Sequence, residues 1–136
     1  MAATALVDTG FLIALLDARD AHHRWAKALA SRQSPLWTTC EAVLSEAFHI
    51  LGPRDAESLA TLLRRGAVAP AFRFEDNVEA VVRLMQKYAD VPMSIADACL
   101  VRMTEIMPDP ILLTTDADFR VYRRHSRQTV PCILPN

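Results

Sequence analysis

The fold of this chain is decided by residues 4–16, which read TALVDTGFLIALL. The apolar run Thr4–Val7 predicts a short buried strand, and the longer apolar run Thr9–Leu16 predicts a helix. Asp8 stands at the junction between them. An aspartate in this position either caps the helix by accepting an orphan backbone N–H or supplies chemistry at the end of the strand. Both interpretations remain open at this point.

The same alternation of short apolar runs and longer helical patterns continues along the chain. Further helices are expected at His22–Ser31, Glu41–Leu51, Arg54–Arg65, Asn77–Tyr88, Ser94–Ile106 and Ala117–His125, and further strands at Leu36–Thr38, Val68–Phe72, Ile111–Leu113 and Thr129–Ile133. Strands that alternate with helices predict an α/β fold, in which a parallel sheet is covered on both faces. Because there is no linker or repeat, we expect residues 1–136 to form a single domain.

Composition excludes several classes of protein. Of the 136 residues, 51% are hydrophobic, which is enough for a core and argues against disorder. The apolar run Phe11–Leu16 is far shorter than the roughly 20 residues that a membrane span needs, and residues 1–7 lack the basic segment of a signal peptide. Three widely spaced cysteines among apolar neighbours are typical of buried thiols in a reducing cytoplasm. The net charge of −1 argues against a protein that coats nucleic acid.

Carboxylates recur at the strand ends and helix starts of the expected sheet. Asp8 follows the first strand, and Asp116 follows the strand Ile111–Leu113 after two threonines. If these strands are neighbours, both acids lie at one edge of the sheet, where ligands bind in open α/β folds. Asp116 or Asp118 is expected to cap the segment that follows, which leaves the other aspartate free for chemistry.

Two more acids lie on helices. Glu46 falls on or beside the apolar stripe of the helix Glu41–Leu51, where an unpaired charge is costly, so it either binds a partner or forms a salt bridge. Asp97 lies among small and apolar residues near a helix start. It is either the third residue of a capping box that begins at Ser94 or a metal ligand.

Taken together, the acids point to a metal site. Clustered carboxylates raise one another's pKa unless cations neutralise them, and an oxygen-only set of ligands suits Mg²⁺ or Mn²⁺. Such ions polarise a phosphoryl oxygen and activate water for phosphodiester cleavage. No competing catalytic motif is present, since the chain lacks a Gly-rich phosphate loop, a Gly-x-Ser-x-Gly elbow and a His-Glu-x-x-His pair.

Basic residues are concentrated in the segment that follows Asp118. Its basic residues are Arg120, Arg123, Arg124, His125 and Arg127. Arg120, Arg123 and Arg124 are candidates for contacts with RNA phosphates. The alternative is that they form a solvated helix face.

Four motifs in this order resemble PIN-domain ribonucleases, and specifically the VapC-type toxins of bacterial toxin–antitoxin pairs. The motifs are VDTGFLIALLD (7–17) followed by HHRWA (22–26), then VLSEA (43–47), MSIADA (93–98) and TTDADF (114–119). The tail from RVYRR (120–124) to Pro131 is also similar, so the resemblance covers nearly the whole chain.

The resemblance implies a three-layer α/β/α sandwich with a mostly parallel sheet and a divalent metal centre holding Mg²⁺ or Mn²⁺. The family's acidic quartet falls on Asp8, Glu46, Asp97 and Asp116. Asp8, Asp97 and Asp116 are the expected metal ligands, and Glu46 completes the cluster or orients the attacking water. Thr9, Thr115 and Asp118 are expected to support the site.

The resemblance also implies a cytoplasmic endoribonuclease toxin that forms a homodimer and is inhibited by a cognate antitoxin protein. The alternative is a non-catalytic RNA- or protein-binding module on the same fold. Receiver domains and haloacid dehalogenase phosphatases are disfavoured, because Asp8 is followed by Thr9-Gly10 where those proteins need a second acid.

Overall fold

A computed structural model of the chain describes residues 3–136, and a five-stranded parallel sheet forms its centre. The strands lie side by side in the order β3 (Val68–Pro70), β2 (Trp37–Thr39), β1 (Thr4–Val7), β4 (Pro110–Leu113) and β7 (Cys132–Ile133). Val7 of β1 is in register with Leu113 of β4. The residues that follow these two strands, Asp8 and Thr114, are therefore neighbours at the carboxyl edge of the sheet.

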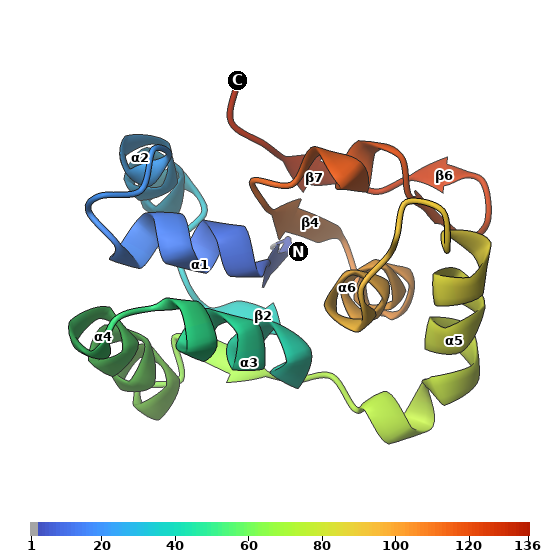
Figure 1. The fold of residues 1–136 in the computed structure, drawn as a ribbon, viewed down its shortest axis with the longest axis horizontal. Helices are drawn as coiled ribbons and strands as arrows, with labels where there is room; N and C mark the ends of the chain where they lie inside the picture. Colours follow the sequence, from blue (N-terminus) through green and yellow to red (C-terminus); the bar gives the residue numbers. More distant parts are fainter. Residues whose placement is uncertain (1–2) are drawn as a thin grey trace.

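Helices cover both faces of this sheet. Within residues 3–136 they are α1 (Thr9–Leu16), α2 (His23–Arg32), α3 (Glu41–Ile50), α4 (Pro53–Arg64), α5 (Val78–Lys87) and α6 (Ile95–Ile106). The chain moves one way across the sheet from β1 to β3 and returns the other way to β4, so right-handed crossovers place the helices on opposite faces. Figure 1 shows α1, α2 and α4 on one side and α5 and α6 on the other. The predicted three-layer sandwich with a mostly parallel sheet is confirmed.

The core lies against both faces of the two central strands. Leu6, Val7, Leu112 and Leu113 are fully buried, which is typical of parallel strands covered by helices on both sides. The edge strand β3 ends at Pro70, and an edge position tolerates a residue that cannot donate a ladder hydrogen bond. No helix within residues 3–136 combines the length and apolar character that crossing a bilayer requires.

The segment after β4 differs from the prediction. The predicted helix Ala117–His125 is a short 3₁₀ turn, η2 (Ala117–Arg120), followed by an antiparallel hairpin of β5 (Arg123–Arg124) and β6 (Gln128–Thr129). The predicted strand Thr129–Ile133 is divided between β6 and β7. His125 and Ser126 adopt positive φ angles of 48° and 69°, which end any helix and turn the chain back on itself. A second 3₁₀ turn, η1 (Phe74–Asp76), precedes α5.

Candidate active site

Asp8 lies at the point where the strand order reverses, between β1 and β4. It caps α1, because one carboxylate oxygen, Oδ1, accepts the Thr9 N–H at 2.7 Å. Its other oxygen, Oδ2, accepts the Thr114 hydroxyl at 2.7 Å. The side chain is buried, with 6% of the residue exposed. The capping and chemical interpretations of Asp8 are therefore compatible, since each oxygen keeps a further lone pair.

Asp97 is placed by the start of α6. Ser94 caps this helix by accepting the Asp97 N–H at 3.0 Å, which is one of the two hydrogen bonds of the predicted capping box. The Asp97 carboxylate accepts the Tyr122 hydroxyl through Oδ2 at 2.8 Å. Tyr122 is fully buried, so its hydroxyl holds this carboxylate in a fixed orientation.

Asp116 lies on the loop that leaves β4. Its backbone N–H donates to the Thr114 hydroxyl at 3.0 Å, and its Oδ1 accepts the Asp118 N–H at 2.9 Å. Asp116 therefore caps the η2 turn, and Asp118 is the exposed member of the pair. Through Thr114, a single hydroxyl ties the loop carrying Asp116 to the carboxylate of Asp8.

Glu46 reaches the same region from α3. Its Oε2 accepts the Thr9 hydroxyl at 3.1 Å, although Glu46 and Thr9 are 37 residues apart. Glu46 is exposed, so it lies beside the buried face of α3 and not within it. Its side chain is thus available to solvent and to a ligand, and Thr9 is the supporting hydroxyl that touches it.

The carboxylates influence one another electrostatically. Burial raises the pKa of Asp8 from its usual 3.8 to about 6, and the charges of Asp97 and Asp116 add to this rise against the hydrogen bonds from Thr114 and Thr9. Burial also raises the pKa of Asp97, with a further contribution from the charge of Asp116. These effects place Asp8, Asp97 and Asp116 within electrostatic reach of one another.

Thr115 was predicted to support the site, and the hydroxyl that contacts Asp8 belongs to its neighbour. Thr114, not Thr115, hydrogen-bonds Asp8. Thr115 instead packs on Gly10, so closely that a Cβ built on Gly10 would lie 2.0 Å from Thr115 Oγ1. Glycine at position 10 therefore lets the first turn of α1 approach the loop that carries Asp116.

The three predicted phosphate-binding arginines occupy different environments. Arg120 is exposed. Arg124 packs on the end of α6, where its Nη2 donates to the Thr104 carbonyl and its Nη1 donates to Gln128 Oε1. Arg123 donates to backbone carbonyls of its own segment. The cluster is therefore not a solvated helix face, and Arg124 serves mainly to hold the β5–β6 hairpin on α6.

The acids fit a divalent cation by their chemistry. Their donor atoms are all oxygen, and within residues 3–136 none of Asp8, Glu46, Asp97 and Asp116 forms an ion pair with a basic side chain. In the part of the chain that the structure describes, no three His, Cys, Asp or Glu side chains are close enough together to hold an ion as they stand. An oxygen-only set of acids without a cationic partner, with raised pKa values at Asp8 and Asp97, is the environment that Mg²⁺ or Mn²⁺ stabilises.

Comparison with known proteins identifies the family. The family model described as the PIN domain matches residues 5–124. The chain belongs to the PIN-domain family. This PIN domain is similar to the crystal structure of VapC20 from Mycobacterium tuberculosis, a toxin described as cleaving the sarcin–ricin loop, with 25% identity and a TM-score of 0.71 over 87% of this chain and 94% of that one. Comparison with curated protein sequences gives no match. The resemblance to PIN domains of the VapC type is confirmed.

Two residues that contact the candidate carboxylates were not predicted from the sequence. The sequence assigns Tyr122 no role at the site, and of the two threonines before Asp116 it favours Thr115 over Thr114. Once β1 and β4 are known to pair with Val7 opposite Leu113, the next residues, Asp8 and Thr114, also fall opposite each other, so Thr114 follows from the strand register. Nothing in the local sequence indicates that Tyr122 reaches Asp97, because the contact depends on how the chain returns over α6.

Proposed function

We propose that this PIN-domain protein is a toxin-type endoribonuclease that cleaves RNA phosphodiester bonds at the cluster formed by Asp8, Glu46, Asp97 and Asp116. One observation carries the proposal: a buried carboxylate with a raised pKa, Asp8, lies at the switch point of the sheet beside two other acids. Burying a charge in this way destabilises the fold, so a role in binding a cation accounts for it.

Each acid has a role that follows from its contacts. Asp8, Asp97 and Asp116 would hold a divalent cation, with Thr114 orienting Asp8 and Tyr122 orienting Asp97. Glu46, exposed and steadied by Thr9, would complete the cluster or orient the attacking water. When bound, Mg²⁺ or Mn²⁺ would polarise a phosphoryl oxygen and stabilise the leaving oxygen.

The proposed partners follow from the family and from the VapC20 comparison. We infer an RNA substrate, a cognate antitoxin that covers the acidic site, a homodimeric assembly and action in the cytoplasm. The sarcin–ricin loop that VapC20 cleaves is a suitable first substrate to assay.

Replacing Asp97 with Asn tests the site. We expect Asp97→Asn to lower Mg²⁺-dependent cleavage of total cellular RNA at least about 100-fold, because one ligand charge is lost while the Tyr122 contact can persist. Cleavage products mapped by sequencing their ends give the measurement and the preferred RNA. The control, Asp90→Asn, removes an exposed carboxylate from the loop between α5 and α6 and should cleave like wild type.

Two results would contradict the proposal. Unchanged cleavage by Asp97→Asn would show that Asp97 is not part of the active site. Equal RNA binding in Mg²⁺ and in EDTA, with no cleavage under either metal, would instead support the non-catalytic binding module.

A further inference from the structure

A basic pocket lies between α5 and the β5–β6 hairpin, outside the carboxylate cluster. It has a volume of about 210 Å³, and Arg83 and Lys87 of α5 and Arg123 of β5 line it together with one acid, Glu105. We call this the α5 pocket. Its three cations outnumber its single carboxylate, so its lining is positively charged while the nearby site is negatively charged.

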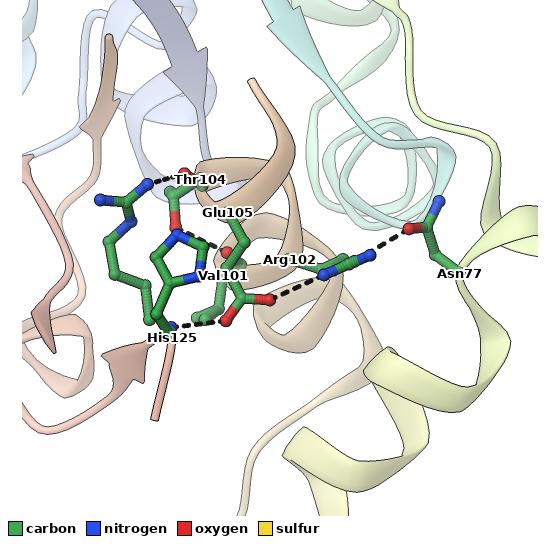
Figure 2. Close-up of polar contacts among 7 residues, drawn as sticks. Asn77, Val101, Arg102, Thr104, Glu105 and His125 are labelled. Atoms are coloured by element: carbon green, nitrogen blue, oxygen red, sulfur yellow. Dashed lines mark hydrogen bonds and ion pairs between the residues drawn. The ribbon is translucent and has the colours of Figure 1, made fainter. Parts of the chain in front are cut away.

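Glu105 does not cancel this positive charge, because its carboxylate is already engaged. Figure 2 shows Glu105 of α6 accepting the Arg102 side chain, at 3.2 Å from Nη1, and the His125 backbone N–H, at 2.7 Å. Arg102 also donates through Nε to Asn77 Oδ1 at 2.9 Å. The Glu105 charge is thus balanced by Arg102, and Glu105 fixes the hairpin that forms one wall of the pocket.

Arg123 presents a guanidinium that is fixed in place and has a free edge. Its Nη1 donates to the carbonyls of Arg120, Val121 and Tyr122 at 2.7, 3.2 and 3.0 Å. Its Nε and Nη2 have no hydrogen-bond partner among residues 3–136. These two nitrogens form the edge of an arginine that binds a carboxylate or a phosphate through two parallel hydrogen bonds.

The two cations of α5 are also available to a ligand. Lys87 Nζ donates one hydrogen bond, to the Ser126 carbonyl at 3.0 Å, and an ammonium has two further donors. Arg83 pairs with Glu79 at 3.2 Å, but the two side chains are 75% and 79% exposed, and such surface pairs are weak. An anion could therefore replace Glu79 at Arg83 at little cost.

Two aromatic rings in edge-to-face contact, Tyr88 and Tyr122, connect the α5 pocket to the acidic site. The Tyr88 hydroxyl accepts the Arg123 N–H at 2.9 Å, and the Tyr88 ring lies against the Tyr122 ring with centroids 5.1 Å apart. The Tyr122 hydroxyl in turn donates to Asp97. These contacts link the pocket to Asp97, while Glu105 in its lining lies eight residues after Asp97, about two turns further along α6.

We infer that the α5 pocket binds a backbone phosphate of the RNA strand whose scissile bond lies at the carboxylates. This inference rests on the proposed function. A phosphodiester matches the fixed edge of Arg123, and Arg83 and Lys87 supply the charge that draws in a polyanion. The site would hold the strand near the end of α6, about two helix turns from Asp97.

The double variant Arg83→Gln/Lys87→Gln tests this inference. Because counterion release at each phosphate contact contributes a slope of about 0.7 for single strands, the variant should bind single-stranded RNA about 5- to 25-fold more weakly at 0.1 M salt. The slope of log Kd against log salt should fall by about 0.7 to 1.4. Fluorescence anisotropy of a labelled RNA oligonucleotide in EDTA measures both, and in Mg²⁺ KM should rise while kcat stays within about twofold.

The matched control is Arg24→Gln/Lys27→Gln. This variant removes the same charge from two exposed residues of α2, on the other side of the sheet. It should keep wild-type affinity, slope and KM. If the Arg83→Gln/Lys87→Gln variant has the same RNA affinity, salt slope and KM as this control, the inference is overturned.

A second experiment locates the phosphate. Single neutral methylphosphonates are placed in turn along the oligonucleotide, and we expect one position to weaken binding to wild type without weakening it further in the Arg83→Gln/Lys87→Gln variant. Additive losses at every position would overturn the inference. So would a variant that loses binding of free inorganic phosphate, or of a glutamate-rich peptide, while its RNA affinity is unchanged.

The outcomes separate this inference from the proposed function. If wild-type protein cleaves no RNA, the proposed function fails. If wild type and the α2 control cleave RNA and the α5 variant does so with the same KM, only the inference about the α5 pocket fails.

Discussion

At the scale of single residues, the buried position of Asp8 lowers the stability of the fold. Its carboxylate is buried at the sheet edge, and the charges of Asp97 and Asp116 oppose its ionisation. Because the pKa in the fold is about 6 and the ordinary value is 3.8, the folded protein holds the Asp8 proton more tightly than the unfolded chain does. Its contribution to stability is therefore fully present below about pH 3.8 and is lost as the pH rises through about 6.

Replacing Asp8 with Asn should reveal this cost. Asn cannot ionise, yet it keeps an oxygen for the Thr9 N–H. At pH 7 in EDTA we expect Asp8→Asn to raise the free energy of unfolding by up to about 3 kcal/mol, since one pKa unit corresponds to about 1.4 kcal/mol. At pH 4 the gain should shrink to well under 1 kcal/mol. Urea unfolding at the two pH values measures it.

The control for this prediction is Asp90→Asn, which removes an exposed acid and should change stability little at either pH. A gain from Asp8→Asn that is the same at pH 4 and pH 7 would show that the charge of Asp8 does not destabilise the fold.

Some residues of the candidate site could be predicted from the sequence, and others could not. Asp8 and Asp116 could be placed at one sheet edge because each follows a strand, and β1 and β4 are indeed neighbours. Helix periodicity predicts Glu46 on or beside the buried face, and its exposure in the fold places it beside that face, in contact with Thr9. The contact between Tyr122 and Asp97 joins residues brought together by the tertiary fold, so local patterns do not indicate it.

At the scale of elements, the approach of α1 to the loop after β4 governs the site. Thr115 Oγ1 occupies the space that a Cβ on Gly10 would need, at 2.0 Å from it. A larger residue at position 10 must push these two elements apart. Since Asp8 begins α1 and Asp116 lies on the loop, the same displacement would separate the two carboxylates.

Gly10→Ala tests this packing. Ala normally favours a helix over Gly by about 1 kcal/mol, but overpacking costs roughly 1–3 kcal/mol, so we expect net destabilisation of about 1–2 kcal/mol. The double variant Gly10→Ala/Thr115→Ala removes the clashing hydroxyl and should recover most of this loss in urea unfolding. Gly52→Ala, where nothing lies within 4 Å, is the control. Additive effects of the two substitutions would show that they do not clash.

Most helices and strands could be predicted, because their apolar residues are the ones that the fold buries. The strand Thr4–Val7 and the helix Thr9–Leu16 have the bounds that the apolar runs indicate. The region after β4 could not be predicted, because the turn at His125 and Ser126 uses positive φ angles without Gly or Asn. The Glu105 side chain on α6 holds that turn by accepting the His125 N–H, so a distant element determines the local structure.

At the scale of the whole molecule, the order of the strands creates the site. The alternation of strands and helices predicts a parallel sheet, but the order β3-β2-β1-β4-β7 follows from which strands pair, and local patterns leave this open. This order makes β1 and β4 neighbours at the switch point and brings α6 over the sheet edge. Three carboxylates far apart in sequence therefore depend on the complete sheet for their proximity.

A bound cation should stabilise the whole fold by neutralising this cluster. Any ligand that binds only the folded state adds stability, by about 2.7 kcal/mol at 100 times its Kd. We therefore expect Mg²⁺ or Mn²⁺ to raise the Tm of wild type by roughly 5–10 °C and EDTA to reverse the rise. Asp97→Asn should lose most of this shift while Asp90→Asn keeps it. An identical Tm for wild type with and without metal would argue against a cation at this site.

The hydrogen bond between Thr114 and Asp8 joins residues that are 106 positions apart. During synthesis on the ribosome, Asp8 and Glu46 therefore emerge long before the residues that complete their cluster. The early segments can form helices, but they cannot assemble the carboxylate cluster until α6 and β4 have joined the sheet. If cleavage requires these carboxylates, an unfinished chain would leave the RNA of the ribosome that makes it intact, and activity would begin only after β4 has paired with β1.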